Sequence, residues 1–161
     1  MYSDIQNDEE LLQGDAWQGL VLIDFTTLQR KPVSGIILSN SCDLDPHNPR
    51  LTVPSITFAP IVSLERYVGR IDSLGVGAQQ RDSHVDAVKK QQVTSLLFLP
   101  GVPGGMPDSI ANLGEAASHP VDDFLGRPER VRLLRLNDFG FFLFVFKLSI
   151  HFCRMYEGVA R

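Results

Sequence analysis

The segment from Lys31 to Asp45, KPVSGIILSNSCDLD, decides how the chain is expected to fold. Its middle part, residues 35–38, is an unbroken apolar run, which is typical of a β-strand covered on both faces. Pro32 suits the first residue of such a strand, where no ladder donor is needed. A polar turn follows and carries a thiol at Cys42 and a carboxylate at Asp43. The sequence therefore predicts a central strand that ends in a turn with reactive groups.

Segments rich in β-branched and aromatic residues predict further strands along the chain. The strands are expected at 16–25, at 33–39, within 51–63 as one or two short bent strands, at 93–99 and at 130–136. Two polar segments, 64–68 and 78–92, favour helix. The loop 100–107 holds three prolines and three glycines, which prevent regular structure.

The tail of the chain, 139–156, has apolar residues at helical spacing and is too long for one strand, so it is expected to form a helix. Asn137-Asp138 precedes it and suits an N-cap. The apolar run 139–146 is too short for a membrane span, and we expect it to be buried core.

The length, composition and charge of the chain limit the kind of protein that it can be. With 161 residues, of which 43% are hydrophobic, the chain is long enough to bury one core, and a single domain, 1–161, is expected. The net charge of −4 disfavours binding of RNA through bulk positive charge. Two distant cysteines and an N-terminus without signal-peptide features predict a cytoplasmic protein. No cofactor and no contact with a membrane are expected.

Three short motifs in a fixed order carry a resemblance to a known family. They are Gly14-Asp15-Ala16-Trp17, then Arg30-Lys31-Pro32-Val33 leading into residues 36–40, and then residues 58–63, FAPIVS. This order resembles that of the PemK/MazF-like proteins. Members of that family are small SH3-like β-barrels, and many are ribosome-independent endoribonuclease toxins of toxin–antitoxin systems.

The resemblance implies a mainly β domain with added helices, built as a small SH3-like barrel of about five to seven strands. Barrel core strands are expected over 14–63, a helical insertion over 64–92, the remaining strands with the Pro/Gly loop over 93–136, and a C-terminal helix over 137–157.

The same resemblance implies where a nuclease site would lie. The family places an arginine directly before the proline, and a threonine or serine after a Pro-Ile or Pro-Leu pair, at the scissile phosphate. Here Lys31 precedes Pro32, Arg30 lies one residue earlier, and Val62 takes the threonine position with Ser63 beside it. Lysine lacks the bidentate fork of arginine, and a one-residue displacement changes the face of a strand. A nuclease of this type would therefore depend on Arg30, Lys31 and Ser63.

A second resemblance covers more of the chain. Residues 39–44, SNSCDL, match the [ST]-x-[ST]-C-D-[LIV] turn of a group of small bacterial proteins, which also share a Leu-Pro segment and a C-terminal helix that ends near an arginine. The corresponding segments here are 97–100 and 151–154. This resemblance implies no particular function.

The Cys42 turn admits three interpretations. As a nucleophile, Cys42 needs a nearby base, and His47 in the same loop is the nearest candidate. A metal site would combine Cys42, Asp43, Asp45 and His47, which is a cramped ligand set, and no metal is predicted. The interpretation that we expect is structural: Cys42 is a small buried residue, and Asp43 caps the turn.

A basic cluster follows in the predicted strand 130–136. Arg130 and Arg132 would share one face of this strand and, with Lys31, are the candidates for contact with nucleic-acid phosphates. A solvated strand face is the simpler expectation. Trp17 is expected in the core, and His84 and His119 are expected at the surface.

Three functions are therefore weighed. The first is a non-catalytic interaction or regulatory module of bacterial origin, whose partner is another protein or a second copy of the chain. The second is a toxin-like endoribonuclease of the PemK/MazF type. The third is a cysteine- or metal-dependent enzyme built on the Cys42 turn. The first is expected, because the nuclease residues do not align with the family pattern.

Overall fold

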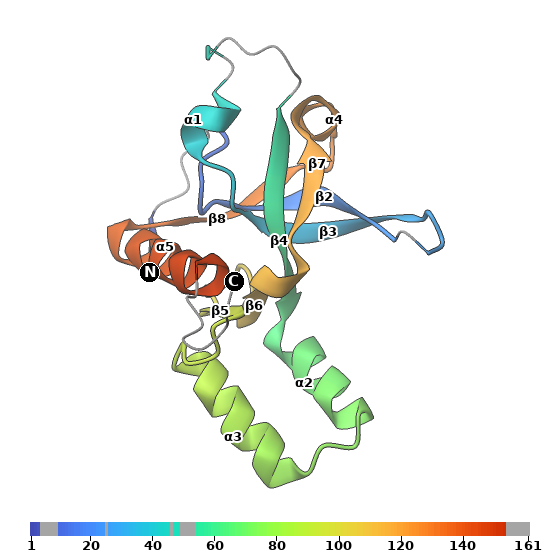
Figure 1. Cartoon of the computed structure of the whole chain (residues 1–161), viewed down its shortest axis with the longest axis vertical. Coiled ribbons are helices and arrows are strands. Elements are labelled where there is room, and N and C mark those ends of the chain that lie inside the picture. Colours follow the sequence, from blue (N-terminus) through green and yellow to red (C-terminus); the bar gives the residue numbers. More distant parts are fainter. Residues whose placement is uncertain (4–9, 25, 46, 49–53, 154–161) are drawn as a thin grey trace, which may run out of the picture.

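The computed structural model describes residues 1–3, 10–24, 26–45, 47–48 and 54–153. Within them, eight strands form one curled antiparallel sheet, and five α-helices lie around it (Figure 1). The expected mainly β fold with added helices is confirmed, and the described strands outnumber the expected five to seven.

The strands and helices alternate irregularly along the chain. The strands are β1 (Tyr2–Ser3), β2 (Ala16–Ile23), β3 (Arg30–Ile37), β4 (Ser55–Ser63), β5 (Leu96–Leu99), β6 (Ser109–Asn112), β7 (Ala117–Pro120) and β8 (Val131–Leu136). The helices are α1 (Ser41–Leu44), α2 (Leu64–Ser73), α3 (Ala78–Lys89), α4 (Val121–Leu125) and α5 (Asp138–Phe152). Strand neighbours in the sheet are β1-β8-β2-β3-β4-β6-β5, and β7 pairs with the first half of β4.

Strand β3 lies in the middle of the sheet, and its last three residues, 35–37, are buried on both faces, as the apolar run predicts. Ile36 belongs to a core cluster that includes residues from β5 and β8, which lie towards opposite ends of the strand order, so this cluster fills the inside of the curl. Ile37 belongs to a second cluster on the outer face. Gly35 is required because a Cβ there would lie 2.6 Å from Phe58 and 2.9 Å from Leu20.

The two edges of the curled sheet are joined by a side chain. The hydroxyl of Tyr2, in edge strand β1, donates a 2.6 Å hydrogen bond to the carbonyl of Pro100, directly after the opposite edge strand β5. The sheet thus curls far enough to enclose one core.

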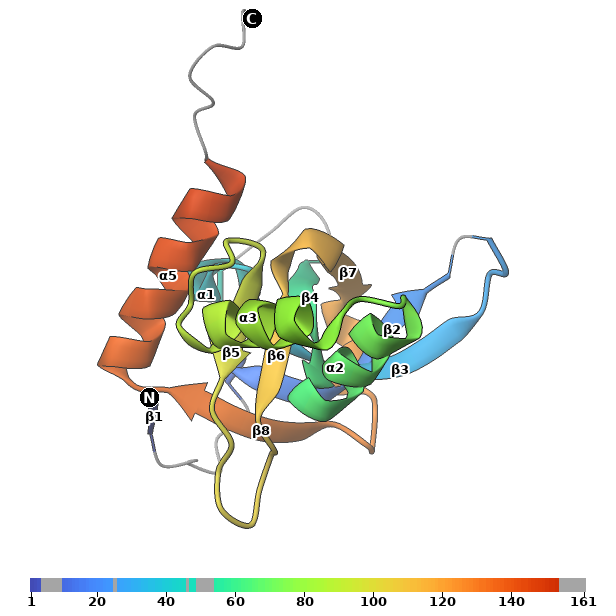
Figure 2. The same cartoon turned by 90° about the horizontal axis from the view of Figure 1, so that it is seen from below.

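Helix α5 lies along one side of the molecule and packs against the inner core (Figure 2). Asn137 is its N-cap, as predicted, and accepts a 2.9 Å hydrogen bond from the backbone N–H of Gly140. Gly140 has no room for a side chain, because a Cβ would collide with the carbonyl oxygen of Met1. The predicted tail helix is present as far as Phe152, and residues 154–157 lie outside the described part of the chain.

Lys147 anchors the second half of α5. Its side chain is buried, and Nζ donates hydrogen bonds to the carbonyls of Gln91 at 2.9 Å and Val93 at 2.6 Å. Burial lowers the pKa of Lys147 to about 8, because the ammonium group loses its hydration. The side of α5 that carries Lys147 therefore faces the rest of the domain.

Helices α2 and α3 form a hairpin that projects from the end of β4 (Figure 1). They lie within the segment for which a helical insertion was expected. The hydroxyl of Tyr67 and Nε2 of His84 are hydrogen-bonded at 2.8 Å, and Arg81 forms a 3.0 Å ion pair with Asp72. His84, expected to be an isolated surface residue, therefore helps to join the two helices.

The buried amine of Lys147 gives a pH-dependent test of this packing. Because the pKa of Lys147 is 10.5 in the unfolded chain and about 8 in the folded one, the unfolded state binds more protons between these values. The unfolding free energy of the wild type, relative to Lys147→Met, should therefore rise by about 2 kcal/mol across this window. Urea unfolding of both proteins from about pH 7 to pH 10 measures the difference. A difference that stays constant with pH would contradict desolvation of Lys147.

Candidate functional site

The Cys42 turn is a single helical turn, α1, at the surface. Asn40, rather than Asp43, caps it by accepting a 3.1 Å hydrogen bond from the backbone N–H of Cys42. Cys42 and Asp43 are both exposed, while Leu44 packs in the outer core cluster. The expectation of a buried Cys42 and a capping Asp43 is therefore wrong, because the turn uses Leu44 as its buried residue.

His47, the candidate base for Cys42, is hydrogen-bonded to Asp45. Nδ1 of His47 lies 3.1 Å from Oδ1 of Asp45, and the backbone N–H of His47 donates to the same oxygen at 2.8 Å. The backbone hydrogen bond and then the side-chain one lower the pKa of Asp45. Among the described residues, no group of three or more His, Cys, Asp or Glu side chains could hold a metal ion.

The three nuclease candidates do not converge on one site, and Arg30 and Ser63 have separate structural partners. Arg30 begins β3 and pairs with Asp123 of α4 at 2.8 Å. Lys31 is the next residue of the strand and is exposed, so the two side chains point to opposite faces. Ser63 ends β4, and its hydroxyl caps α2 by accepting a 3.2 Å hydrogen bond from the backbone N–H of Arg66.

A charged cluster around Asp123 was missed by the sequence analysis. Oδ2 of Asp123 accepts hydrogen bonds from Nη2 of Arg30 and Nε2 of His119, and Nε of Arg127 lies 3.4 Å from the same oxygen. The hydrogen bond from His119 and then the charges of the arginines lower the pKa of Asp123. His119 is only 2% exposed and its ring packs edge-on against Phe124, so its expected surface position is wrong. The four-residue spacing between His119 and Asp123 is the feature of the sequence that could have indicated this pair.

The arginines of β8 pair with a buried carboxylate. Asp15 is 1% exposed and accepts hydrogen bonds from Arg135 at 3.0 Å and 3.2 Å, while Nε of Arg132 lies 3.2 Å from Oδ2. Residues three apart in a regular strand face opposite sides. The pairing of β2 with β8 shifts register between Ala16 and Trp17, and this bulge lets both arginines reach Asp15.

Arg132 has two further partners in the same place. Its guanidinium carbon lies 4.6 Å from the centroid of the Trp17 ring, and Nη2 donates a 2.6 Å hydrogen bond to the carbonyl of Glu10. The expected solvated face is therefore wrong for Arg132, which is buried, and Arg130 is partly buried. Trp17 lies in the core, as expected.

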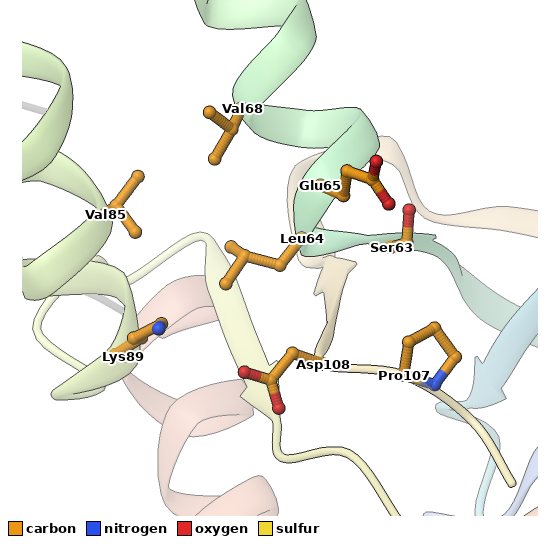
Figure 3. Close-up of a pocket in the computed structure, with 8 residues that line it drawn as sticks. All are labelled: Ser63, Leu64, Glu65, Val68, Val85, Lys89, Pro107 and Asp108. Carbon is orange, nitrogen blue, oxygen red and sulfur yellow. The ribbon is translucent and has the colours of Figure 1, made fainter. Parts of the chain in front are cut away.

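A hollow of about 410 Å³ lies between α2, α3 and the start of β6 (Figure 3). Its walls are mostly apolar, from Leu64, Val68 and Val85, with Lys89 and Asp108 at the rim. In Figure 3, Ser63 lies on one side of Leu64 and Lys89 on the other, so these polar groups do not converge on one point. The hollow separates two helices and offers no assembled reaction site.

The outer face of α5 exposes aromatic side chains that were expected to form core. The exposed fractions are 70% for Phe139, 73% for Phe142 and 55% for Phe146. Gly140, Phe144 and Lys147 lie on the opposite, buried face. The expectation of a buried run over 139–146 is wrong for these residues, because the helix turns Gly140 and Lys147 inward.

This surface, which we call the aromatic face of α5, extends along the whole helix. It consists of Phe139, Phe142, Val145, Phe146, Ser149 and Phe152, all of which are exposed, with Phe141 exposed beside it. Among the described residues, none of the helices combines the length and apolar character needed to cross a bilayer.

Comparison with known proteins adds no assignment. No protein-family model matches the chain, and no curated protein matches its sequence. The function of the chain is therefore inferred from the geometry of these surfaces and clusters.

The Asp15 cluster predicts a large loss of stability on neutralisation. Asp15→Asn leaves two largely buried guanidinium groups without their counter-charge, and the unfolding free energy should fall by about 3 kcal/mol. Urea unfolding followed by the fluorescence of Trp17, the one tryptophan of the chain, measures the loss.

The matched control for this substitution is Asp86→Asn, which removes an exposed pair with Lys90. Its cost should stay below about 0.5 kcal/mol, as is usual for surface pairs on helices. Equal losses in the two variants would show that Asp15 is not a buried counter-charge.

Proposed function

We propose that this chain is a non-catalytic interaction module and that the aromatic face of α5 is its binding surface. The observation that carries the proposal is the row of exposed phenylalanines at positions 139, 142 and 146. A contiguous apolar patch of this kind on a folded domain marks a site of interaction. An SH3-like barrel, as the PemK/MazF resemblance implies, would be the scaffold that presents it.

The size of the patch supports this proposal. With about 200 Å² for a whole phenylalanine side chain, the exposed parts of the five outer phenylalanines and Val145 amount to roughly 600 Å². Patches on monomeric proteins reach about 300–600 Å² and are often functional at that size. The aromatic face of α5 is therefore at the upper end of what a domain exposes without a partner.

The rigidity of α5 also supports the proposal. Asn137 caps its first turn, Phe144 is fully buried, and Lys147 bonds to two carbonyls behind it. A helix that is already held in place loses little conformational entropy when a partner binds its outer face.

Catalysis is less well supported by the arrangement of the polar groups. The one described cluster that combines a histidine, a carboxylate and a nuclease candidate is that of His119, Asp123 and Arg30. Its histidine is buried against Phe124 and is therefore shielded from a substrate. A general acid or base must come within hydrogen-bond reach of the reacting group.

A ribonuclease assay tests the non-catalytic part of the proposal. The purified chain should leave a mixed single-stranded RNA intact, because Arg30 and Ser63 are engaged in separate structural contacts. Gel electrophoresis of the RNA after incubation is the measurement. Cleavage by the wild type that is lost in Lys31→Ala would instead establish the endoribonuclease function.

Photo-crosslinking tests the binding surface in the bacterial cells that naturally contain the chain. A benzophenone amino acid at Phe142 should give a discrete cross-linked adduct, identified by mass spectrometry. The matched control is the same residue at Leu74, which is equally exposed, at 74% against 73%, but lies after α2. Absence of an adduct at Phe142, or equal adducts at both sites, would refute the binding surface.

A further inference from the structure

We infer that the aromatic face of α5 binds the same face of a second copy of the chain, with the two helices antiparallel about a twofold axis beside Val145 and Phe146. This inference rests on the proposed binding function of that face and names its partner. Four observations support it: the area, the lack of charged side chains at the exposed positions from Phe139 to Phe152, the spacing of the side chains and the orientation of Lys147.

The area of the face is sufficient for a dimer. Roughly 600 Å² of side chain from each copy gives roughly 1,200 Å² in total, which is the lower limit for stable protein–protein interfaces. Parts of the domain beside α5 would add to this total. A second copy of the chain is therefore large enough to cover the aromatic face of α5.

The exposed positions from Phe139 to Phe152, all within the described residues, carry no Asp, Glu, Lys or Arg side chain. Lys147 is the charged residue in this stretch, and it is buried on the opposite face. Asp138, the first residue of α5, is exposed and lies one turn before Phe142. The antiparallel pairing places Asp138 opposite residue 153 of the second copy, so the two Asp138 carboxylates lie at opposite ends of the interface and do not repel each other.

The spacing of the side chains matches itself when one helix is reversed. Exposed residues recur at 139, 142, 145, 146, 149 and 152. Reversal about the midpoint between 145 and 146 places Phe142 opposite Ser149, Phe146 opposite Val145 and Phe139 opposite Phe152. Because a twofold axis repeats every contact, the central rings of Phe142 and Phe146 each meet a smaller side chain twice, and a pair of phenylalanines lies at each end of the interface.

A parallel pair of helices fills space less evenly. It would place Phe142 against Phe142, Phe146 against Phe146 and Ser149 against Ser149. Helices that pack 8–10 Å apart, as is typical, interdigitate best when large residues face small ones. The antiparallel arrangement satisfies this condition for Phe142 and Phe146 at the middle of the interface, and it also opposes the two helix dipoles.

A membrane surface is the competing occupant of an exposed aromatic helix. Interfacial helices carry Lys and Arg on their polar face, next to anionic headgroups. In α5 that side is packed on the domain, and Lys147 bonds to the carbonyls of Gln91 and Val93. The described helix therefore lacks the basic side that would favour a membrane.

Light scattering during size-exclusion chromatography tests the dimer. The wild type should elute with twice the mass of one chain, which is 17.9 kDa. Phe142→Asp and Ser149→Glu each place a charge within the interface, where the two positions face each other, and should give monomers with unchanged circular dichroism. Leu74→Asp, at a similarly exposed position outside α5, should remain dimeric. A monomeric wild type would overturn the inference, whether or not it binds lipid vesicles.

Disulfide trapping tests the orientation in a background where Cys42 and Cys153 are replaced by serine. Chains with Phe142→Cys, mixed with chains with Ser149→Cys, should form a mixed disulfide under mild oxidation, because these positions face each other. Each variant alone should cross-link slowly. Rapid self-linking of Ser149→Cys would indicate parallel helices and overturn the proposed arrangement.

The outcomes separate this inference from the proposed function. A monomer in solution, combined with an adduct between Phe142 and a different protein in cells, would refute the dimer and leave the binding surface in place. A dimer whose Phe142 adduct contains two copies of the chain would support both. A monomer that forms no adduct would refute both.

Discussion

The carboxylate of Asp15 is buried, and the rest of the sheet depends on its neutralisation. An unpaired charge in this position would cost several kcal/mol, so β8 must lie beside β2 with both Arg132 and Arg135 directed at Asp15. The bulge between the two strands follows from that requirement. The position of β8 in turn fixes Asn137, where α5 begins.

Two core clusters lie on opposite faces of β3, so the two faces of the sheet pack against different helices. The inner cluster fills the curl and receives Phe144 from α5, while the outer cluster joins Trp17 to Phe124 of α4. The hairpin of α2 and α3 covers a third, smaller cluster around Leu64. The polar groups lie between these clusters as structural links. Among the described residues, those of the aromatic face of α5 belong to none of the three clusters and are exposed.

The central strand, the N-cap at Asn137 and the tail helix could be predicted because each depends on residues close together in sequence. The outward face of α5 could not be predicted, because it depends on Lys147 meeting carbonyls more than fifty residues earlier. A lysine and a glycine normally indicate the solvated side of a helix. Arg132 was misplaced for the same reason, since its partner, Asp15, lies far away in the chain. His119 has its partner, Asp123, only four residues away, and its burial was not evident from the polar residues around it in the sequence.

The pairing of β2 with β8 has a consequence for how the chain folds during synthesis. Asp15 leaves the ribosome more than a hundred residues before Arg132 and Arg135. Strand β1 likewise cannot pair until β8 has been synthesised. Contacts so distant in sequence are slow to form, because a long loop must close first. We therefore expect the first half of the chain to stay unable to complete its sheet until nearly the whole chain has been made, with folding as one late event.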